Sequence, residues 1–172
     1  MIVRKLMPTF MLAVLSVTAL AQVPNPFNFY SDTAKVAASS VNTITLCAVQ
    51  SGSGAGNYQS IAPGTVMTFR FGSGFGALNS VGTPRITPWF SSTPSGNPAT
   101  ISDFTVTTNL AAGKIVFTYN AVTAKDMAFR DALCIDANWT APALSTEAVI
   151  DFNNNVANLG SPQTEGYQIF VK

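Results

Sequence analysis

The most regular hydrophobic pattern of the chain spans Asp103–Asn120, where two alternating segments flank a short loop of small residues that ends at Gly113. A period of two places successive side chains on opposite faces of a β-strand. One face would carry Phe104, Val106, Thr108, Ile115, Phe117 and Tyr119. The other face is mostly threonine and asparagine, as in antiparallel strands with one side in water. The pattern predicts a β-hairpin, which we expect to lie in the interior of the fold as scaffold.

Further segments with strand patterns follow at regular spacing, separated by turn signals such as Pro63-Gly64. They are Val41–Val49, Thr65–Phe71, Ala132–Trp139, Ala148–Phe152 and Tyr167–Val171, with Arg85–Phe90 as a short edge strand. Seven or eight strands at this spacing predict an all-β fold, an antiparallel two-sheet β-sandwich of Ig-like or jelly-roll type. We assign residues 41–172 to this single domain.

The first 21 residues have the pattern of a cleaved signal peptide. Arg4 and Lys5 are basic, Phe10–Leu20 is apolar, and Ala19-Leu20-Ala21 matches the A-x-A cleavage pattern. An N-terminal membrane anchor is the alternative, but the apolar run is shorter than the roughly 20 residues that cross a bilayer. We therefore expect a mature chain that begins at Gln22, is secreted or held at the cell surface, and has no membrane span after cleavage.

Residues 22–40 predict an extended N-terminal arm. Two prolines, Pro24 and Pro26, favour extended backbone. Phe27, Phe29 and Tyr30 are too apolar for a solvated tail, so the arm needs a surface to pack on. That surface is either its own domain or a neighbouring molecule, to which the arm adds a strand. The second option is our working hypothesis, with these three aromatic residues as interaction residues.

The chain has two cysteines, Cys47 and Cys134. Two thiols in an oxidising compartment usually pair, so we predict an intramolecular disulfide between them. Intermolecular pairing and two free buried thiols are the alternatives. Because the chain has no His, two cysteines fall short of the usual zinc ligand set, and we expect no metal and no cofactor. Asp136 would share a strand face with Cys134 and needs a polar neighbour or an exposed setting there.

Charge is sparse, at 10% of residues against 47% apolar ones. Removal of Arg4 and Lys5 leaves seven basic and eight acidic residues, a net charge of −1. No basic cluster is present, which argues against a nucleic-acid partner. Weak self-repulsion favours association between copies, and the alternative is an ordinary exterior rich in Thr and Asn. Without His, Ser-His-Asp and Cys-His catalysis is excluded, and we assign no catalytic residues.

Aromatic residues outside the clear strands suggest a surface for stacking on sugar rings. The candidates are Tyr58, Phe75, Trp89, Phe90 and Trp139. Trp139 shares the strand parity of Leu133 and Ile135, so we expect it in the core, against the disulfide. Trp89 lies in a proline-rich loop and is the better surface candidate, so Trp89 and Phe90 join the interaction residues.

Two short motifs have specific alternatives. Asp151, Asn153 and Asn155 match the start of a calcium loop, but Val156 and Pro162 occupy positions that require Gly and Glu. An Asn-rich turn between two strands is therefore the preferred interpretation. Asn138-Trp139-Thr140 is a glycosylation sequon that lies within a predicted strand.

No family is identified by motif. The layout, a cleaved signal followed by an aromatic arm and a β-sandwich of low charge, resembles subunits of bacterial extracellular filaments and matrix fibres, in which a terminal strand of one subunit completes its neighbour. The resemblance implies an exported, non-enzymatic structural or adhesive protein, a filament, matrix or surface-layer subunit that self-associates through its arm or binds a surface partner. A secreted carbohydrate-binding module is the alternative, and a small hydrolase with a carboxylate pair is the third hypothesis.

Overall fold

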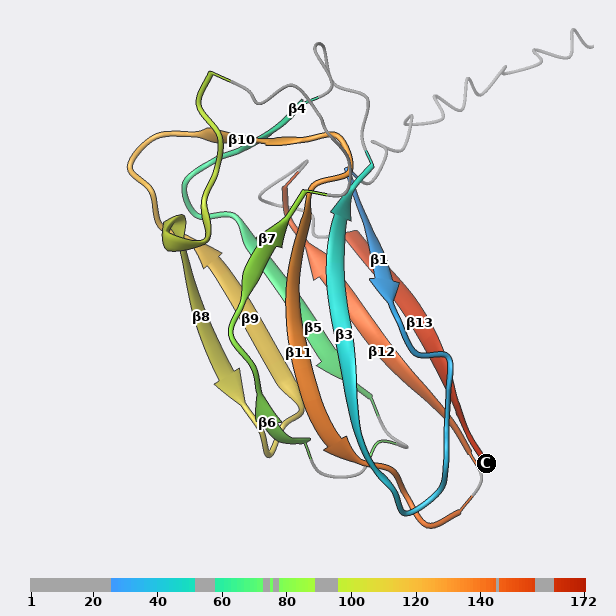
Figure 1. The fold of residues 1–172 in the computed structure, drawn as a ribbon. Helices are drawn as coiled ribbons and strands as arrows, with labels where there is room; N and C mark the ends of the chain where they lie inside the picture. The colour runs from blue at the N-terminus through green and yellow to red at the C-terminus, as the bar shows by residue number, and fades with distance from the viewer. Residues whose placement is uncertain are drawn as a thin grey trace, which may run out of the picture.

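The computed structural model describes residues 26–51, 58–72, 75, 78–88, 96–144, 146–156 and 163–172. The predicted signal peptide, Trp89 and Phe90 lie outside these residues. The described chain forms β-strands, apart from one 3-10 turn at Ile101–Asp103. Figure 1 shows two sheets packed face to face, so the predicted antiparallel two-sheet β-sandwich is confirmed.

The front sheet in Figure 1, called sheet A, is antiparallel throughout. Its strands are β1 (Phe27–Ser31), β3 (Val41–Gln50), β11 (Ala132–Thr140), β6 (Leu78–Val81) and β7 (Arg85–Thr87). The order is β1-β3-β11, and both β6 and β7 pair with β11. The two central strands are long, and together they set the outer face of sheet A.

The second sheet, sheet B, packs behind sheet A. In spatial order its strands are β2 (Lys35–Val36), β13 (Gln163–Val171), β12 (Thr146–Asn154), β5 (Val66–Phe71), β9 (Lys114–Tyr119) and β8 (Phe104–Asn109). All neighbours are antiparallel except β2 and β13, which are parallel. A small third sheet pairs β4 (Tyr58–Ile61) with β10 (Lys125–Ala128).

The described residues hold thirteen strands, more than the seven or eight predicted. The predicted edge strand at Arg85–Phe90 is present as β7, of which the structure describes Arg85–Thr87. Most of the additional strands, β2, β4, β6 and β10, have only two to four residues. Segments of that length contain too few residues to show a period. The long strands agree with the alternation of the sequence, so the pattern identified the body of the sandwich and missed part of its rim.

The core fills the space between the sheets with large apolar side chains. The largest fully buried ones include Trp139, Tyr119, Phe27, Phe69, Phe117 and Phe152. Trp139 lies in this core as predicted, and its ring packs 4.6 Å from that of Phe75. It does not contact the disulfide as we had expected, because Cys134 points to the opposite face of β11.

The predicted hairpin is confirmed as β8 and β9, joined by a turn at residues 110–113. Gly113 has a φ of +58°, and a Cβ there would lie 3.0 Å from the Cβ of Phe71, so the turn requires glycine. The hairpin is not interior, because β8 ends the strand order of sheet B. The alternation is the same for an edge and an interior hairpin and could not distinguish them.

The N-terminal arm belongs to the sandwich of its own chain, which corrects the predicted intermolecular strand and the domain boundary at residue 41. β1 pairs with β3, and β2 pairs with β13. Phe27 is fully buried, and the ring of Phe29 lies 5.4 Å from those of Phe69 and Tyr167. Burial of these two rings against the chain's own core accounts for the intramolecular placement. Among the described residues, no helix is long and apolar enough to cross a membrane.

Truncation of Phe27 tests the contribution of the arm to the fold. Phe27→Ala should lower the free energy of unfolding by about 3–5 kcal/mol, because it leaves a cavity in the core. Urea unfolding monitored by Trp fluorescence measures the loss. Asn28→Ala, an exposed position of the same strand, should change it by less than about 0.5 kcal/mol. Equal effects of the two variants would contradict the docking of β1 in its own domain.

Candidate functional site

The outer face of sheet A carries the disulfide at its centre. Cys47 of β3 and Cys134 of β11 are in register, and their Cα atoms are 4.2 Å apart. The predicted pairing is confirmed. Both sulfur-bearing side chains are buried against Val49 and Ala132 on this face. The disulfide therefore links the two central strands of the sheet through side chains that point away from the main core.

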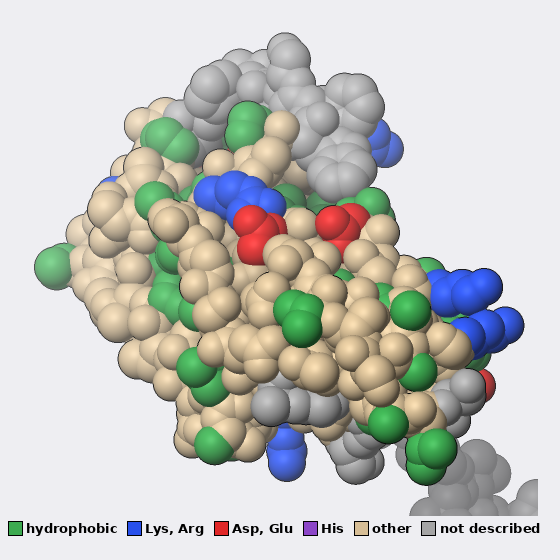
Figure 2. Space-filling model, turned by 60° about the horizontal axis from the view of Figure 1, so that its bottom comes forward, with side chains coloured by type: hydrophobic (Ala, Val, Ile, Leu, Met, Phe, Trp, Pro, Cys, Tyr) green, Lys and Arg blue, Asp and Glu red, His purple; other side chains and the backbone are tan. Residues whose placement is uncertain are grey.

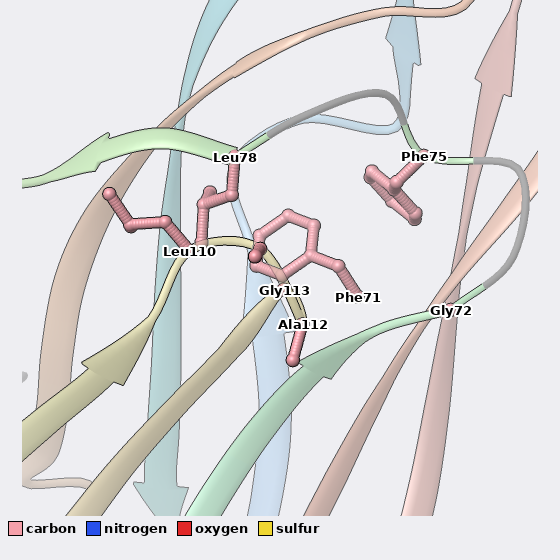
Figure 3. Close-up of a pocket in the computed structure, with 8 residues that line it drawn as sticks. Phe71, Gly72, Phe75, Leu78, Leu110, Ala112 and Gly113 are labelled. Carbon is pink, nitrogen blue, oxygen red and sulfur yellow. The ribbon is translucent and has the colours of Figure 1, made fainter.

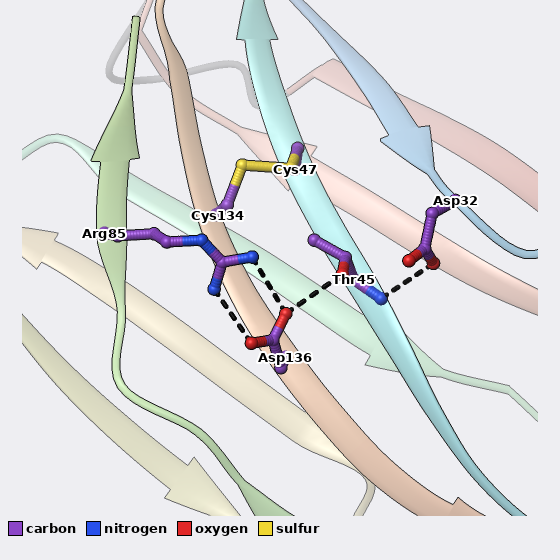
Figure 4. Close-up of a disulfide and its surroundings, with 6 residues drawn as sticks. All are labelled: Asp32, Thr45, Cys47, Arg85, Cys134 and Asp136. Carbon is purple, nitrogen blue, oxygen red and sulfur yellow. Dashed lines mark hydrogen bonds and ion pairs between the residues drawn. A yellow bond between two sulfur atoms is a disulfide. The ribbon is translucent and has the colours of Figure 1, made fainter.

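A charged group adjoins the disulfide on the same face (Figure 4). Arg85 of β7 donates two hydrogen bonds of 2.9 Å to the carboxylate of Asp136. The hydroxyl of Thr45 donates to the same carboxylate at 3.0 Å, and the Thr45 N–H donates to Asp32 at 2.9 Å. These contacts supply the polar neighbour that the strand parity of Asp136 required.

The Arg85–Asp136 pair is partly exposed, with 42% and 37% of the two side chains accessible. The hydrogen bonds from Arg85 hold the pKa of Asp136 below its ordinary value, although burial acts in the opposite direction. The same hydrogen bonds raise the pKa of Arg85. Both groups are therefore charged at neutral pH. Because Asp136 also accepts the Thr45 hydroxyl, the pair links side chains of β7, β11 and β3.

Amide and hydroxyl groups continue this network toward the other end of β11. The amide of Asn138 donates to the Thr43 hydroxyl at 3.2 Å. The amide of Asn79 donates to the Asn138 carbonyl at 3.0 Å and to the Thr140 hydroxyl at 3.1 Å. Side chains from β3, β11 and β6 are thus bonded to one another while remaining accessible to solvent. The sequon residue Asn138 is a member of this network.

We call these side chains the polar face, defined by Thr43, Thr45, Asn79, Arg85, Asp136, Asn138 and Thr140. The strand alternation of β11 indicated two of them, Asp136 and Asn138, on the face of Cys134. Asn79 and Arg85 were missed as members because β6 and β7 are short, and a register irregularity occurs where β6 meets Asn138 and Trp139. Figure 2 shows one side of the molecule, where few charged side chains lie among uncharged groups.

Of the predicted interaction residues, the structure describes Phe27, Phe29 and Tyr30, and these three do not form one exposed cluster. Phe27 and Phe29 pack in the core, and Tyr30 is 42% exposed. Tyr30 borders a shallow hollow of about 320 Å³ with Asn28, Val49 and Arg130. Two of the suggested sugar-stacking residues, Trp139 and Phe75, are packed against each other inside the sandwich. The described structure therefore presents no aromatic platform built from those two rings.

A second hollow, of about 240 Å³, lies at the end of the sandwich beside the β8–β9 turn. Figure 3 shows Phe71, Phe75 and Leu78 from the β5–β6 region near Leu110 and Gly113 of the turn. The rings of Phe71 and Phe75 meet edge to face at 4.8 Å. The lining includes no ionisable side chain among the residues the structure describes, so the hollow offers apolar contact rather than acid–base chemistry.

The calcium-like residues do not form a loop. Asp151 and Asn153 lie on β12, and Asn155 follows its end, so the three alternate along an extended segment. The Asn155 side chain accepts the Val66 N–H at 2.7 Å, and the Asn153 side chain accepts the Thr164 hydroxyl. In place of the expected turn, Asp151 and Asn153 belong to strand β12, and Asn155 directly follows it. Within the described ranges, no group of three metal-binding side chains occurs.

Several carboxylates have structural partners. Asp103 forms an ion pair with Lys125 at 2.7 Å and accepts the Thr100 N–H. Asp131 accepts the Ala128 N–H at 3.1 Å, and burial raises its pKa. Glu165 accepts the Phe29 N–H at 2.7 Å. Each of these carboxylates stabilises a turn or a strand edge, and none of the contacts pairs two carboxylates.

No model of a known protein family matches the chain, and no curated protein matches its sequence. Among solved structures, the N-terminal domain of the Streptococcus gordonii adhesin Sgo0707 is similar, with a TM-score of 0.51 and 10% identity. The match covers 88% of this chain and 33% of that one. This likeness shows a shared β-sandwich fold.

Two other solved structures match with lower TM-scores. The sixth cohesin of Acetivibrio cellulolyticus scaffoldin B has a TM-score of 0.49 and 11% identity, with 86% of this chain and 100% of that one covered. The collagen-binding domain of a Staphylococcus aureus adhesin has a TM-score of 0.48 and 10% identity, with 87% and 99% covered.

The Arg85–Asp136 pair predicts a pH-dependent contribution to stability. Arg85→Met should lower the free energy of unfolding at neutral pH by less than about 1 kcal/mol, because the pair is partly exposed. The folded pKa of Asp136 is depressed, so this contribution is present above the unfolded value of about 3.9 and disappears as the pH falls through the folded value. Urea unfolding between about pH 7 and pH 2 measures it. Lys35→Met, a change at an exposed position, is the control. Its free energy of unfolding should not differ from the wild-type value by an amount that disappears at low pH.

Loss of the disulfide should destabilise the fold more strongly. The bridge closes a loop of 87 residues, and restricting the unfolded chain in this way stabilises by about 4 kcal/mol. The double variant Cys47→Ala, Cys134→Ala should therefore unfold at a clearly lower temperature in calorimetry. An unchanged melting temperature would show that the bridge does not constrain the unfolded chain.

Proposed function

We propose that this protein is an exported, non-enzymatic adhesive or structural protein that binds a macromolecular partner outside the cell through the polar face. Export is supported by the signal-peptide pattern of residues 1–21 and by the disulfide, since such bridges persist in oxidising compartments. The non-enzymatic assignment is supported by the structural engagement of Asp103, Asp131 and Asp136.

The hydrogen-bonded arrangement of the polar face carries this proposal. Asn138 and Asn79 are held by neighbouring side chains before any partner arrives. A partner therefore loses less free energy in ordering them, which is the advantage of a preorganised surface. Small ligands bind in concave sites. The side chains of a sheet face form a broad surface instead, which suits a macromolecular partner. The fold shared with the streptococcal adhesin domain agrees with this class of function.

Self-association is the second part of the proposal. A net charge of −1 after removal of the signal peptide gives little electrostatic repulsion between copies. Exchange of the arm would require β1 to leave β3 and expose Phe27 and Phe29 before a neighbour replaced them. Association through a surface that is already available in the folded chain avoids this cost.

Binding measurements on the mature chain test the polar face. Surface plasmon resonance against immobilised extracellular-matrix proteins and cell-surface polysaccharides should give at least one saturable partner. Asn79→Ala should weaken that binding about tenfold, equivalent to about 1.4 kcal/mol, because Asn79 orders two neighbours and is itself accessible. Gln168→Ala, an exposed change on sheet B, is the matched control. Absence of any partner, or equal losses in both variants, would refute the assignment of this face.

A further inference from the structure

The edges of the two main sheets differ in how they are protected. An edge strand presents unpaired backbone groups, and proteins usually block such edges with charges, prolines, short strands or covering segments. At the β1 edge, the Glu165 carboxylate accepts the outward Phe29 N–H at 2.7 Å, and the Tyr167 hydroxyl reaches the Ser31 carbonyl at 3.4 Å. Side chains of β13 therefore cover the edge of β1.

Two other edges are short or interrupted. On β11, β6 and β7 are separated by residues 82–84, which include Gly82 and Pro84, and Pro88 follows β7. The edge strand β2 has only two residues, and its flanking backbone bonds β13 through Phe170 and Lys172. Neither edge offers a long continuous row of backbone donors and acceptors.

The edge at β8 lacks these protections in the described structure. Asn120 donates its N–H to the Asp103 carbonyl, and Tyr119 donates to the Thr65 carbonyl of the β5 side. By the alternation of an antiparallel ladder, Thr105 and Thr107 bond β9, whereas Val106 and Thr108 direct their backbone groups away from it. Figure 1 shows β8 at the rim of the molecule. No described strand pairs with its outer side.

The side chains of β8 are also compatible with a neighbouring strand. Residues 104–109 contain no charge, proline or glycine. Val106 is half-buried and Leu110, just beyond the strand, is 38% exposed, so apolar surface remains at the rim. The open edge is thus uncharged and six residues long.

We propose that β8 pairs antiparallel with β8 of a second copy of this chain, on a two-fold axis that passes beside Val106. Val106 of each copy exchanges both of its backbone hydrogen bonds with Val106 of the other, and the Thr108 N–H of each donates to the opposite Phe104 carbonyl. The Phe104 N–H needs no partner, since it already donates to Ile101. The result is a sheet B that continues through both copies.

Self-complementarity favours a second copy over an unrelated peptide as the occupant. On the outer face, Thr105 of one copy lies opposite Thr107 of the other, and Thr–Thr pairs across antiparallel strands are favourable. On the inner side, the two half-buried Val106 side chains meet and lose water. The antiparallel arrangement also separates the two Asp103 residues to opposite ends of the interface, so like charges are not brought together.

This inference rests on the proposed self-association and assigns its interface. Analytical ultracentrifugation of the mature chain should show a concentration-dependent dimer. Thr108→Lys places a cation on the exposed edge, and Val106→Pro removes a donor that makes no bond to β9, so both should weaken dimerisation at least tenfold. Val122→Lys, at a loop position that is 95% exposed, adds the same charge elsewhere and should remain dimeric. Circular dichroism confirms that each variant is folded.

Hydrogen exchange gives the location independently. The amides of Val106 and Thr108 should exchange more slowly as the protein concentration rises, because they become bonded only in the dimer. A wild-type chain that stays monomeric would overturn both the inference and the proposed self-association. A dimer that persists in both folded edge variants would overturn the β8 interface alone. If Asn79→Ala loses partner binding and remains dimeric, the result supports the polar face as the binding surface and leaves the β8 interface standing.

Discussion

Aromatic packing around Phe69 is the contact on which the arrangement of the two sheets depends. Its ring lies 5.0 Å from Phe152, 5.4 Å from Phe29 and 6.1 Å from Phe117. These rings come from three strands of sheet B and from β1 of sheet A, so one cluster joins the sheets and fixes the N-terminal strand. The hydrophobic gain from burying such rings is large compared with the net stability of a domain. This packing holds β1 beside β3, at the edge of sheet A.

The outward-facing residues of sheet A and the edge of sheet B differ in chemistry. Only the inner faces of the two sheets pack into the core. Residues of β3 and β11 that point outward are free of the packing requirement, and they form a hydrogen-bonded polar surface held at its centre by the disulfide. Sheet B ends instead in an uncharged strand whose backbone remains open. In the two proposals made above, the polar face binds a different molecule and the edge at β8 binds a second copy of the chain.

Much of the fold could be predicted from local pattern, because alternation reports which residues face inward. The β8–β9 hairpin, the inward position of Trp139 and the pairing of the cysteines all follow from parity, composition and compartment. The position of a strand within its sheet depends on contacts between residues far apart in the chain. For this reason the hairpin was expected inside the sandwich and the arm outside its own domain.

The candidate site was less accessible from the sequence. Asp136 needed a polar neighbour, which parity indicated, but nothing local identified Arg85 as that neighbour. Asn79 joins the polar face through a register irregularity between β6 and β11. Phe27 shows the same limit, since a ring that packs on its own core and a ring that packs on another molecule have the same sequence pattern.

The position of the disulfide also decides how the chain responds to tension. When the two ends of the chain are pulled apart, the covalent path of the force runs from Cys47 to Cys134 through the sulfur atoms and bypasses the loop of 87 residues between them. At about 3.4 Å per extended residue, roughly 300 Å of chain is withheld from stretching. The strands β4 to β10 lie within that loop, so the covalent path of the force bypasses them and force reaches them only through contacts with other strands, such as the pairing of β5 with β12. The bridge thus limits the length to which a pulled chain can extend while it stays oxidised.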